Sequence, residues 1–141
     1  MASDNTQFSI AVHILVGIAK YAHVNTSQLA QSVNTNPIFV KRIVGKLAKN
    51  GLVLSSRGRN GGNSLVREAK DISLLDVYRA VNAPSLFAIH HYEKVASCSI
   101  SSNIQQTLTE VRNTLQHEVD QKLMQLSIQD MLDDINLKNN K

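Results

Sequence analysis

The chain carries a single cysteine, Cys98, among its 141 residues. One cysteine rules out a disulfide within the chain, so nothing in the sequence asks for an oxidising compartment. No run of apolar residues approaches the roughly 20 that a membrane-spanning helix needs, and no cleavable signal is visible. The sequence therefore predicts a cytoplasmic protein with no membrane partner.

Catalytic motifs are also missing. The chain has no Ser-His-Asp order with supporting motifs and no H-E-x-x-H pattern. Neither G-x-G-x-x-G nor G-x-x-x-x-G-K-[ST], the two common phosphate loops, is present. Cys98 has histidines nearby but no oxyanion-hole signature. We expect no catalytic residues and hence no enzyme.

Positive charge is concentrated in one part of the chain, whose formal net charge is +4. Residues 41–70 contain eight Lys or Arg and one acid, Glu68, which gives a net +7. Residues 71–141 contain six basic and nine acidic residues, which gives −3. A clustered positive charge indicates a polyanionic partner, and nucleic acid is the first candidate.

The basic segment contains a predicted recognition helix. Asn36 is a good N-cap, and Pro37 fits the first turn, where its missing N–H costs nothing. Apolar residues then recur at helical spacing and predict one buried face: Val40, Ile43, Val44 and Leu47. The opposite face carries Ile38, Lys41, Arg42, Gly45 and Lys49. Asn50-Gly51 ends the helix, because glycine readily adopts the left-handed conformation there.

Two helices are expected before the recognition helix. Residues 8–22 form the first, buried on two sides, after a frayed polar segment at residues 1–6. Asn25 and Gln28 resemble a capping box that opens the second. A short turn, 34–35, then completes a helix-turn-helix unit. Three residues at the start of the second helix either donate to DNA phosphates or only cap the helix: Thr26, Ser27 and Gln28.

A glycine-rich hairpin, which we call the wing, is expected after the recognition helix. Its strands are placed at 52–54 and 64–67, and its loop at 57–63. Three glycines and two asparagines allow positive φ and a tight loop, and two arginines make the loop cationic. The loop therefore predicts contacts with the DNA backbone or minor groove through Arg57, Arg59, Asn60 and Gly61. Cradling a nucleotide phosphate is the alternative, but the loop lacks the motifs for it.

An ordered set of short motifs links these segments: Leu47–Val53, Arg57-Gly58, Gly61-Gly62, Ile72–Val77 and Ala80-Val81. In this set the chain resembles the Rrf2 family of bacterial winged-helix regulators, which includes the iron–sulphur regulator IscR, the nitric-oxide sensor NsrR and the cysteine-metabolism repressor CymR. The resemblance extends from the first helix to Leu132. It implies a mainly α fold with a small β-wing, namely a winged helix-turn-helix domain plus a long C-terminal dimerisation helix.

The C-terminal half starts with a helix capped by Ser73, which in the family packs against the winged-helix core. Residues 86–89 are expected to form a short apolar turn or helix, and residues 90–102 a loop. An amphipathic helix of about 35 Å follows. Its apolar residues are spaced by three or four: Ile104, Leu108, Val111, Leu115, Val119, Leu123 and Leu126. So small a domain cannot bury this long stripe alone, so we expect a homodimer.

The chain is expected to end in a short helix, Ser127–Leu132, and a polar tail from Asn136. On this basis we divide the chain into a winged helix-turn-helix DNA-binding domain, 1–82, and a second part, 83–141. The second part contains the linker loop, the long dimerisation helix and the tail.

The loop before the long helix decides the cofactor prediction. Family members that hold a [2Fe–2S] cluster use three cysteines there, whereas this chain has Cys98 among serines. Because such clusters need thiolates, we expect no cofactor. A mixed zinc or copper site from His90, His91, Glu93, Cys98 and His117 is not favoured either, since such side chains are usually plain surface residues. The segment instead resembles a cluster-less branch of the family with one loop cysteine. Cys98 is then either a redox switch or a small packed residue.

These observations predict a homodimeric, cytoplasmic transcriptional regulator, a repressor rather than an activator, that binds a pseudo-palindromic operator in double-stranded DNA. DNA-contact candidates at the start of the recognition helix are Asn36, Pro37, Ile38, Phe39, Lys41 and Arg42. The effector stays open between redox chemistry at Cys98, a small molecule and a protein partner. Two rival readings are a protein-docking winged-helix module, which predicts weak and salt-independent DNA binding, and an enzyme built on Cys98.

Overall fold

The computed structural model describes residues 2–140, with side chains described from Thr6 onward. In chain order its elements are α1 (Ala2–Tyr21), α2 (Thr26–Val33), α3 (Pro37–Lys49), β1 (Val53–Ser56), β2 (Gly62–Leu65), the 3-10 helix η1 (Ala69–Asp71), α4 (Leu74–Ala80), α5 (Ser99–Met124) and α6 (Ile128–Asn139). The fold is thus mainly α with one two-stranded antiparallel sheet, as predicted. No described helix is both long and apolar enough to cross a membrane.

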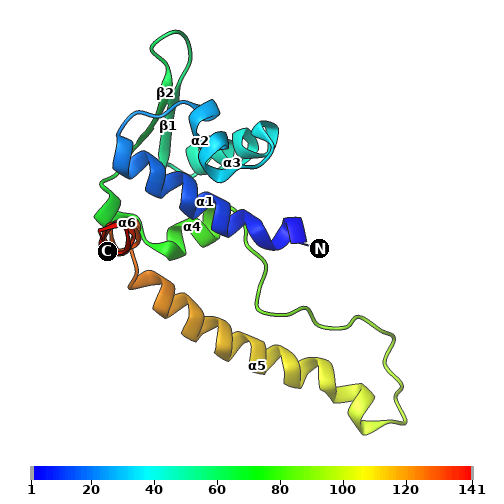
Figure 1. The fold of residues 1–141 in the computed structure, drawn as a ribbon. Helices are drawn as coiled ribbons and strands as arrows, with labels where there is room; N and C mark the ends of the chain where they lie inside the picture. The colour runs from blue at the N-terminus through cyan, green and yellow to red at the C-terminus, as the bar shows by residue number, and fades with distance from the viewer. Residues whose placement is uncertain (1, 141) are drawn as a thin grey trace. The chain divides into compact units, whose positions relative to one another are not determined.

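The described residues form two compact units. The winged-helix unit contains the residues up to Ala83 and those from Leu123 onward, and the long-helix unit contains Pro84–Lys122. Figure 1 shows α1 in the middle of the winged-helix unit, with the β1–β2 hairpin projecting beyond the helices. The C-terminal residues therefore return to the fold that the N-terminal residues begin.

Local sequence signals set the helix boundaries around the helix-turn-helix. Asn25 Oδ1 accepts the Gln28 N–H at 2.8 Å, and Gln28 Oε1 accepts the Asn25 N–H at 3.0 Å, so the predicted capping box of α2 is present. Asn36 caps α3 by accepting the Ile38 N–H at 2.8 Å, and Gly51 follows α3 with φ of +74°. Two further capping boxes open α4 and α6: Ser73 with Asp76, and Ser127 with Asp130. Each box satisfies amides that have no partner inside the helix.

The core of the winged-helix unit is centred on α1 and α3, which pack against each other. The buried side chains of α1 include Ala11, Ile14, Leu15 and Ile18, and those of α3 are Val40, Ile43, Val44 and Leu47. These are the stripes that the apolar periodicity predicts. Fully burying one such aliphatic side chain stabilises the fold by about 1.5–3 kcal/mol, so this pair of stripes is the main source of stability.

Helix α6 packs against α1 and completes the same core. Ile128 is fully buried, and its N–H donates to the Ile72 carbonyl at 2.9 Å. The predicted short helix and polar tail are corrected here, because α6 continues to Asn139. Docking on α1 supplies a stable first turn from which the helix propagates. An ion pair of 2.6 Å between Lys138 and Asp134 adds local support.

Helix α1 starts earlier than the sequence indicates. The sequence predicts a frayed segment and a helix from Phe8, whereas the structure is helical from Ala2; residue 1 lies outside the described residues. A contact near the start supports the longer helix, since Lys46 Nζ on α3 donates to Gln7 Oε1 at 2.7 Å. Ala22 has φ of +68° and ends the helix.

The wing is formed by β1 and β2, which pair in antiparallel register. The predicted strands, 52–54 and 64–67, are displaced from the observed ones. Gly62 and Asn63, which the sequence places in the loop, are strand residues. Both are buried, and the backbone of Asn63 exchanges hydrogen bonds of 2.7 and 3.2 Å with Val24. This long-range contact pulls the two residues into the sheet.

In the long-helix unit, α5 begins at Ser99, five residues before the predicted start at Ile104. Of residues 86–89, expected to form a short turn or helix, the first two form a bend and the other two have no regular secondary structure. Residues 84–98 form the loop before α5. This loop lies along one face of α5, because α5 side chains make hydrogen bonds to the backbone of the loop. The α5 side chains that make these bonds are Ser101, Gln105, Arg112 and Gln116, with lengths from 2.9 to 3.4 Å. The loop therefore covers one face of α5 and leaves the neighbouring face open.

Candidate nucleic-acid interface

Helix α3 turns its second face to solvent. Ile38 is 70% exposed, and Lys41 and Arg42 are exposed beside it. These residues lie on one face because positions three and four apart are neighbours on a helix. Phe39 differs, since it is half-buried and packs against the core. The exposed start of α3 thus presents an apolar side chain flanked by two cations.

Two candidates next to this face are held in place by capping bonds. Asn36 and Pro37 are exposed at the start of α3, but the Asn36 side-chain oxygen is occupied by the Ile38 amide. In α2, the Gln28 side-chain oxygen belongs to the capping box. Within the described residues the N–H groups of these two side-chain amides make no hydrogen bond, so they stay available to a partner.

The start of α2 also carries two hydroxyl groups. Ser27 is exposed, and its neighbour Thr26 is half-buried. The Asn63 side-chain amide on β2 donates to Thr26 Oγ1 at 3.4 Å. Thr26 is therefore held against β2 of the wing, while Ser27 faces solvent.

The wing tip places its cations in solvent. Arg57, Arg59 and Asn60 are exposed. Gly58 has φ of +99°, a conformation that favours glycine, and a Cβ on Gly61 would lie 2.4 Å from the Ser56 carbonyl oxygen. The glycines are thus required by the shape of the turn, as the sequence suggests.

A cleft of about 600 Å³ separates α3 from the wing. Lys41 on α3 and Arg57 on the wing both line it, together with backbone and hydroxyl groups from Asn25, Thr26, Ser55 and Ser56. Gly45 on α3 also lines this cleft, and a Cβ there would meet nothing within 4 Å. Cations and hydrogen-bond donors therefore meet around a concave surface, which suits the oxygens of a phosphate backbone.

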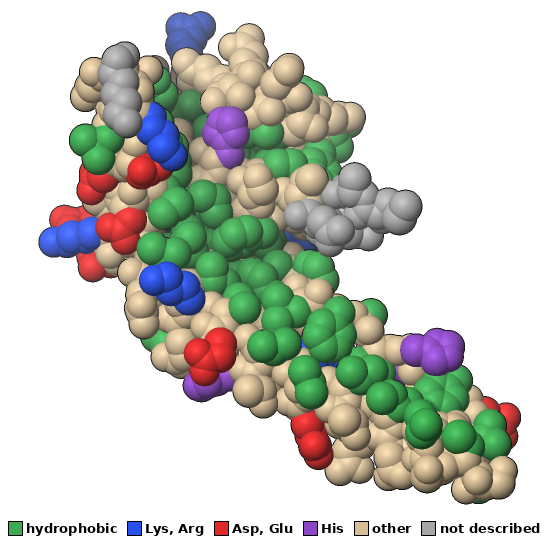
Figure 2. Space-filling view, turned by 60° about the horizontal axis from the view of Figure 1, so that its bottom comes forward, with side chains coloured by type: hydrophobic (Ala, Val, Ile, Leu, Met, Phe, Trp, Pro, Cys, Tyr) green, Lys and Arg blue, Asp and Glu red, His purple; other side chains and the backbone are tan. Residues whose placement is uncertain are grey.

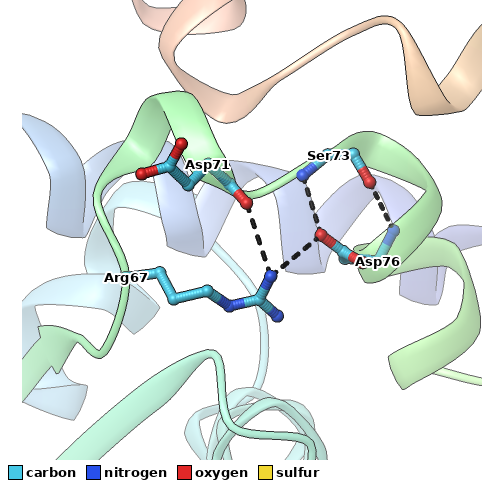
Figure 3. Close-up of polar contacts among 4 residues, drawn as sticks. All are labelled: Arg67, Asp71, Ser73 and Asp76. Carbon is cyan, nitrogen blue, oxygen red and sulfur yellow. Dashed lines mark hydrogen bonds and ion pairs between the residues drawn. The ribbon is translucent and has the colours of Figure 1, made fainter.

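Three of the eight basic side chains in residues 41–70 are engaged by other residues of the chain. Lys46 donates to Gln7, and Lys70 pairs with Glu68 at 3.3 Å. Arg67 Nη1 lies 3.3 Å from Asp76 Oδ2 and 3.4 Å from the Asp71 carbonyl oxygen (Figure 3). Asp76 also accepts the Ser73 N–H, so this carboxylate joins the segment after β2 to the start of α4.

Among the eight basic side chains of residues 41–70, five have neither an ion pair nor a side-chain hydrogen bond within the described residues: Lys41, Arg42, Lys49, Arg57 and Arg59. All five are exposed. The first three belong to α3 and the other two to the wing tip. The eight basic side chains thus divide into five uncompensated cations on two adjacent elements, Lys46 bonded to a neutral side chain, and two that pair with acids.

The surroundings of Cys98 do not suit an iron–sulphur cluster. Cys98 is exposed, and its sulphur accepts the Ser101 N–H at 3.4 Å at the start of α5. His90 stacks on Tyr92, with ring centroids 5.0 Å apart. Nowhere among residues 2–140 do three or more His, Cys, Asp or Glu side chains gather around a common point. A cluster needs several thiolates, and one exposed thiol does not supply them.

A second concave surface lies on the winged-helix unit, away from α3. This groove of about 460 Å³ is lined by α1, α2 and α6. Val12, Val16, Met131 and Ile135 form its apolar lining. Its polar groups include His13, whose Nε2 lies 2.8 Å from Ser32 Oγ, and Lys20.

Comparison with known proteins places the chain among bacterial regulators. The model of the Rrf2 family, described as iron-dependent transcriptional regulators, matches residues 4–134. YwnA of Bacillus subtilis, whose name assigns it as an HTH-type transcriptional regulator, is 36% identical over 129 residues, which cover 91% of this chain and 96% of YwnA. The chain also spans nearly the full length of the solved structures it resembles.

Two solved structures illustrate the likeness of fold. A crystal structure from Lactobacillus plantarum, described as a transcriptional regulator, is 28% identical with a TM-score of 0.80 and covers 94% of this chain and 91% of that one. CymR, the global cysteine regulator of B. subtilis, is 24% identical with a TM-score of 0.61 and covers 91% of this chain and 94% of its own. Proteins similar to this chain are thus transcriptional regulators and not enzymes.

Proposed function

The chain belongs to the Rrf2 family of transcriptional regulators, a membership that implies DNA binding, and from this premise we propose that it is a homodimeric repressor of a pseudo-palindromic operator. The observation that carries the proposal is the set of five uncompensated cations on α3 and the wing tip. A surface with this charge attracts duplex DNA and releases its counterions on binding.

In the proposed complex, α3 enters the major groove. Ile38 contacts base edges or a thymine methyl group, and Lys41 and Arg42 contact bases or the flanking phosphates. Pro37 and Phe39 support the backbone of this turn from either side. Ser27 and the side-chain amides of Gln28 and Asn36 donate to phosphates at the edge of the groove.

The wing lies over the adjacent backbone or minor groove. Arg57 and Arg59 neutralise phosphates, and Asn60 and Gly61 allow the close approach of the loop. Because Arg57 and Lys41 line one cleft, a single strand of the backbone fits between α3 and the wing. Thr26, at the floor of that cleft, faces the same strand.

The second subunit is proposed to pack on α5. Five apolar side chains on the open face of this helix are between 37% and 70% exposed: Ile100, Ile104, Leu108, Val111 and Leu115. In the long-helix unit the adjacent face is covered by residues 84–98, so this strip is what remains for a partner. Figure 2 shows hydrophobic side chains running along this unit. A second copy offers the same strip in a two-fold arrangement, which matches a pseudo-palindromic operator.

Two of the three candidate signals have a place in the structure, and a protein partner stays the third. Cys98, with its exposed sulphur at the start of α5, is the candidate for a redox response. Oxidation there adds volume and polarity beside the proposed dimer helix, which changes the spacing of the two α3 helices. Operator binding before and after mild peroxide, with dithiothreitol reversal, tests this in the natural protein and in Cys98→Ser. Equal affinities in all four states would exclude a redox role for Cys98.

The groove between α1 and α6 favours a small-molecule effector instead. Its volume of about 460 Å³ falls within the usual range for ligand sites, and its lining is mostly apolar with a few polar groups. Ile135→Trp, at an exposed position of the lining, is expected to fill the groove and abolish a response to such an effector while leaving DNA binding in place.

Fluorescence anisotropy with labelled duplex DNA tests the main proposal. The double variant Lys41→Ala/Arg42→Ala is expected to lose affinity and about two units of salt slope, because each lost phosphate contact removes about 0.9. Lys138→Ala on α6 is the matched control, since its exposed pair with Asp134 contributes little to stability. Unchanged binding in the double variant, or an equal loss in the control, contradicts the proposed interface.

A further inference from the structure

Asn63 is the one buried polar side chain among the described residues, with 3% of its surface exposed. Burying a side-chain amide is unfavourable unless its hydrogen bonds are replaced. Here they are replaced. Its Nδ2 donates to the Val24 carbonyl at 3.0 Å and to Thr26 Oγ1 at 3.4 Å, and its Oδ1 accepts the Ser55 hydroxyl at 2.6 Å.

These bonds join three separate segments. Ser55 is on β1, Asn63 is on β2, and Val24 and Thr26 belong to the turn and first residue of α2. The backbone of Asn63 adds two bonds to Val24, at 2.7 and 3.2 Å. Asn63 therefore fastens both strands of the wing to the start of the helix-turn-helix.

His23 supplies a second attachment closer to the wing tip. Its Nε2 lies 3.1 Å from the Asn60 carbonyl oxygen, so the ring donates a hydrogen bond to the loop. Gly62 passes directly against this ring, since a Cβ on Gly62 would lie 2.7 Å from His23 Nε2. The turn between α1 and α2 thus contacts the wing at both its second strand and its loop.

This attachment matters because a two-stranded hairpin is marginally stable on its own. The wing has only four residue pairs in register. Without the contacts of Asn63 and His23, Arg57 and Arg59 would sample many positions relative to α3. Ordering them on DNA would then cost conformational entropy. We propose that Asn63, assisted by His23, is the positioning residue that holds the wing in register with α3 for DNA binding. This inference rests on the proposed DNA-binding function.

A thermodynamic cycle tests the proposal. Salt-dependent binding to duplex DNA is measured for the natural protein, Asn63→Ala, Arg57→Ala/Arg59→Ala and the triple variant. Phosphate contacts by the two wing arginines contribute about 1.8 units of salt slope. A slope of this size corresponds to about a 12-fold loss of affinity when salt is raised from 50 to 200 mM. Asn63→Ala is expected to remove most of that share although it removes no charge. The triple variant is expected to bind like the arginine double variant.

Additive effects in the triple variant, or a natural salt slope in Asn63→Ala, would overturn the positioning role while leaving the proposed function intact. Absence of salt-dependent DNA binding in the natural protein would instead refute the proposed function. Ser64→Ala is the matched control, because its side chain points to the other face of β2. Thermal melting by circular dichroism confirms that each variant is folded at the assay temperature.

If Asn63→Ala does not fold, Gly62→Ala decides the matter. Its added methyl group displaces the His23 ring and breaks the bond to Asn60 without altering Asn63 or the wing charges. A smaller loss of salt slope in the same direction supports the proposal. A natural slope in folded Gly62→Ala contradicts it.

Discussion

Replacing Leu115 by glutamate is expected to convert the protein from a dimer to a monomer. Leu115 lies on the open strip of α5, and 45% of it is exposed. Its neighbours on the strip, Leu108 and Val111, are 38% and 46% exposed. No side chain of α5 is buried, although the helix has 26 residues. A helix that buries so little within its own chain gains stability by pairing.

The size of the effect follows from these exposures. Fully burying a leucine contributes about 1.5–3 kcal/mol, so burying the exposed 45% of Leu115 contributes about 1 kcal/mol. A two-fold dimer contains the residue twice, which gives about 2 kcal/mol. Glutamate removes this and places two carboxylates in the interface, at a further cost of several kcal/mol. A total of at least about 4 kcal/mol weakens dimerisation by at least about 1,000-fold.

Sedimentation velocity at micromolar protein measures the change directly. The natural protein is expected to sediment as a dimer and Leu115→Glu as a monomer with much weaker operator binding. Asn113→Glu adds the same charge on the opposite side of α5 and is expected to stay dimeric. A monomeric natural protein, or a dimeric Leu115→Glu, would refute the reasoning.

Three further outcomes are expected. Arg59→Ala lowers the salt slope of DNA binding by about one unit for every duplex sequence, and a changed sequence preference with an unchanged slope would mean that Arg59 reads bases. Ile128→Ala, at a fully buried position, lowers the free energy of unfolding by about 2–5 kcal/mol in urea titrations, whereas Leu137→Ala, at a position 67% exposed on the same helix, changes it by less than about 0.5 kcal/mol. Ser127→Ala removes the capping box of α6 and costs about 1 kcal/mol in the same titration, and no change would mean that α6 does not depend on its cap.

The elements closest to the candidate interface are predictable from sequence because their signals are local. Asn36 and Pro37 mark the start of α3, and Gly51 marks its end, so both signals lie in the short segment that forms the helix. The apolar spacing of α3 then fixes which face is buried. Gly58 likewise marks the tight turn of the wing.

The parts that sequence did not predict depend on contacts between distant residues. Ile128 packs beside Ile72, so α6 belongs to the winged-helix unit. No local sequence pattern predicts this contact. Asn63 looks like a loop residue because its role depends on Val24, 39 positions away. The pairing of Arg67 with Asp76 removes a cation from the apparent basic cluster for the same reason.

Residue roles at the DNA interface stay predictions, since they depend on a partner molecule. The structure narrows them through burial and bonding. Phe39 is half-buried and Thr26 is bonded to the wing, whereas Ile38 and the five uncompensated cations face solvent. Sequence alone assigns all of these residues the same status, because it cannot distinguish a free side chain from one already engaged.

Selection of bound duplexes from a random DNA pool tests the central claim most directly. The account predicts enrichment of a pseudo-palindromic sequence whose half-sites lie about one helical turn apart, with binding that weakens steeply as salt is raised. Recovery of unselected sequences, with weak binding that is indifferent to salt, would contradict it and favour a protein-docking module.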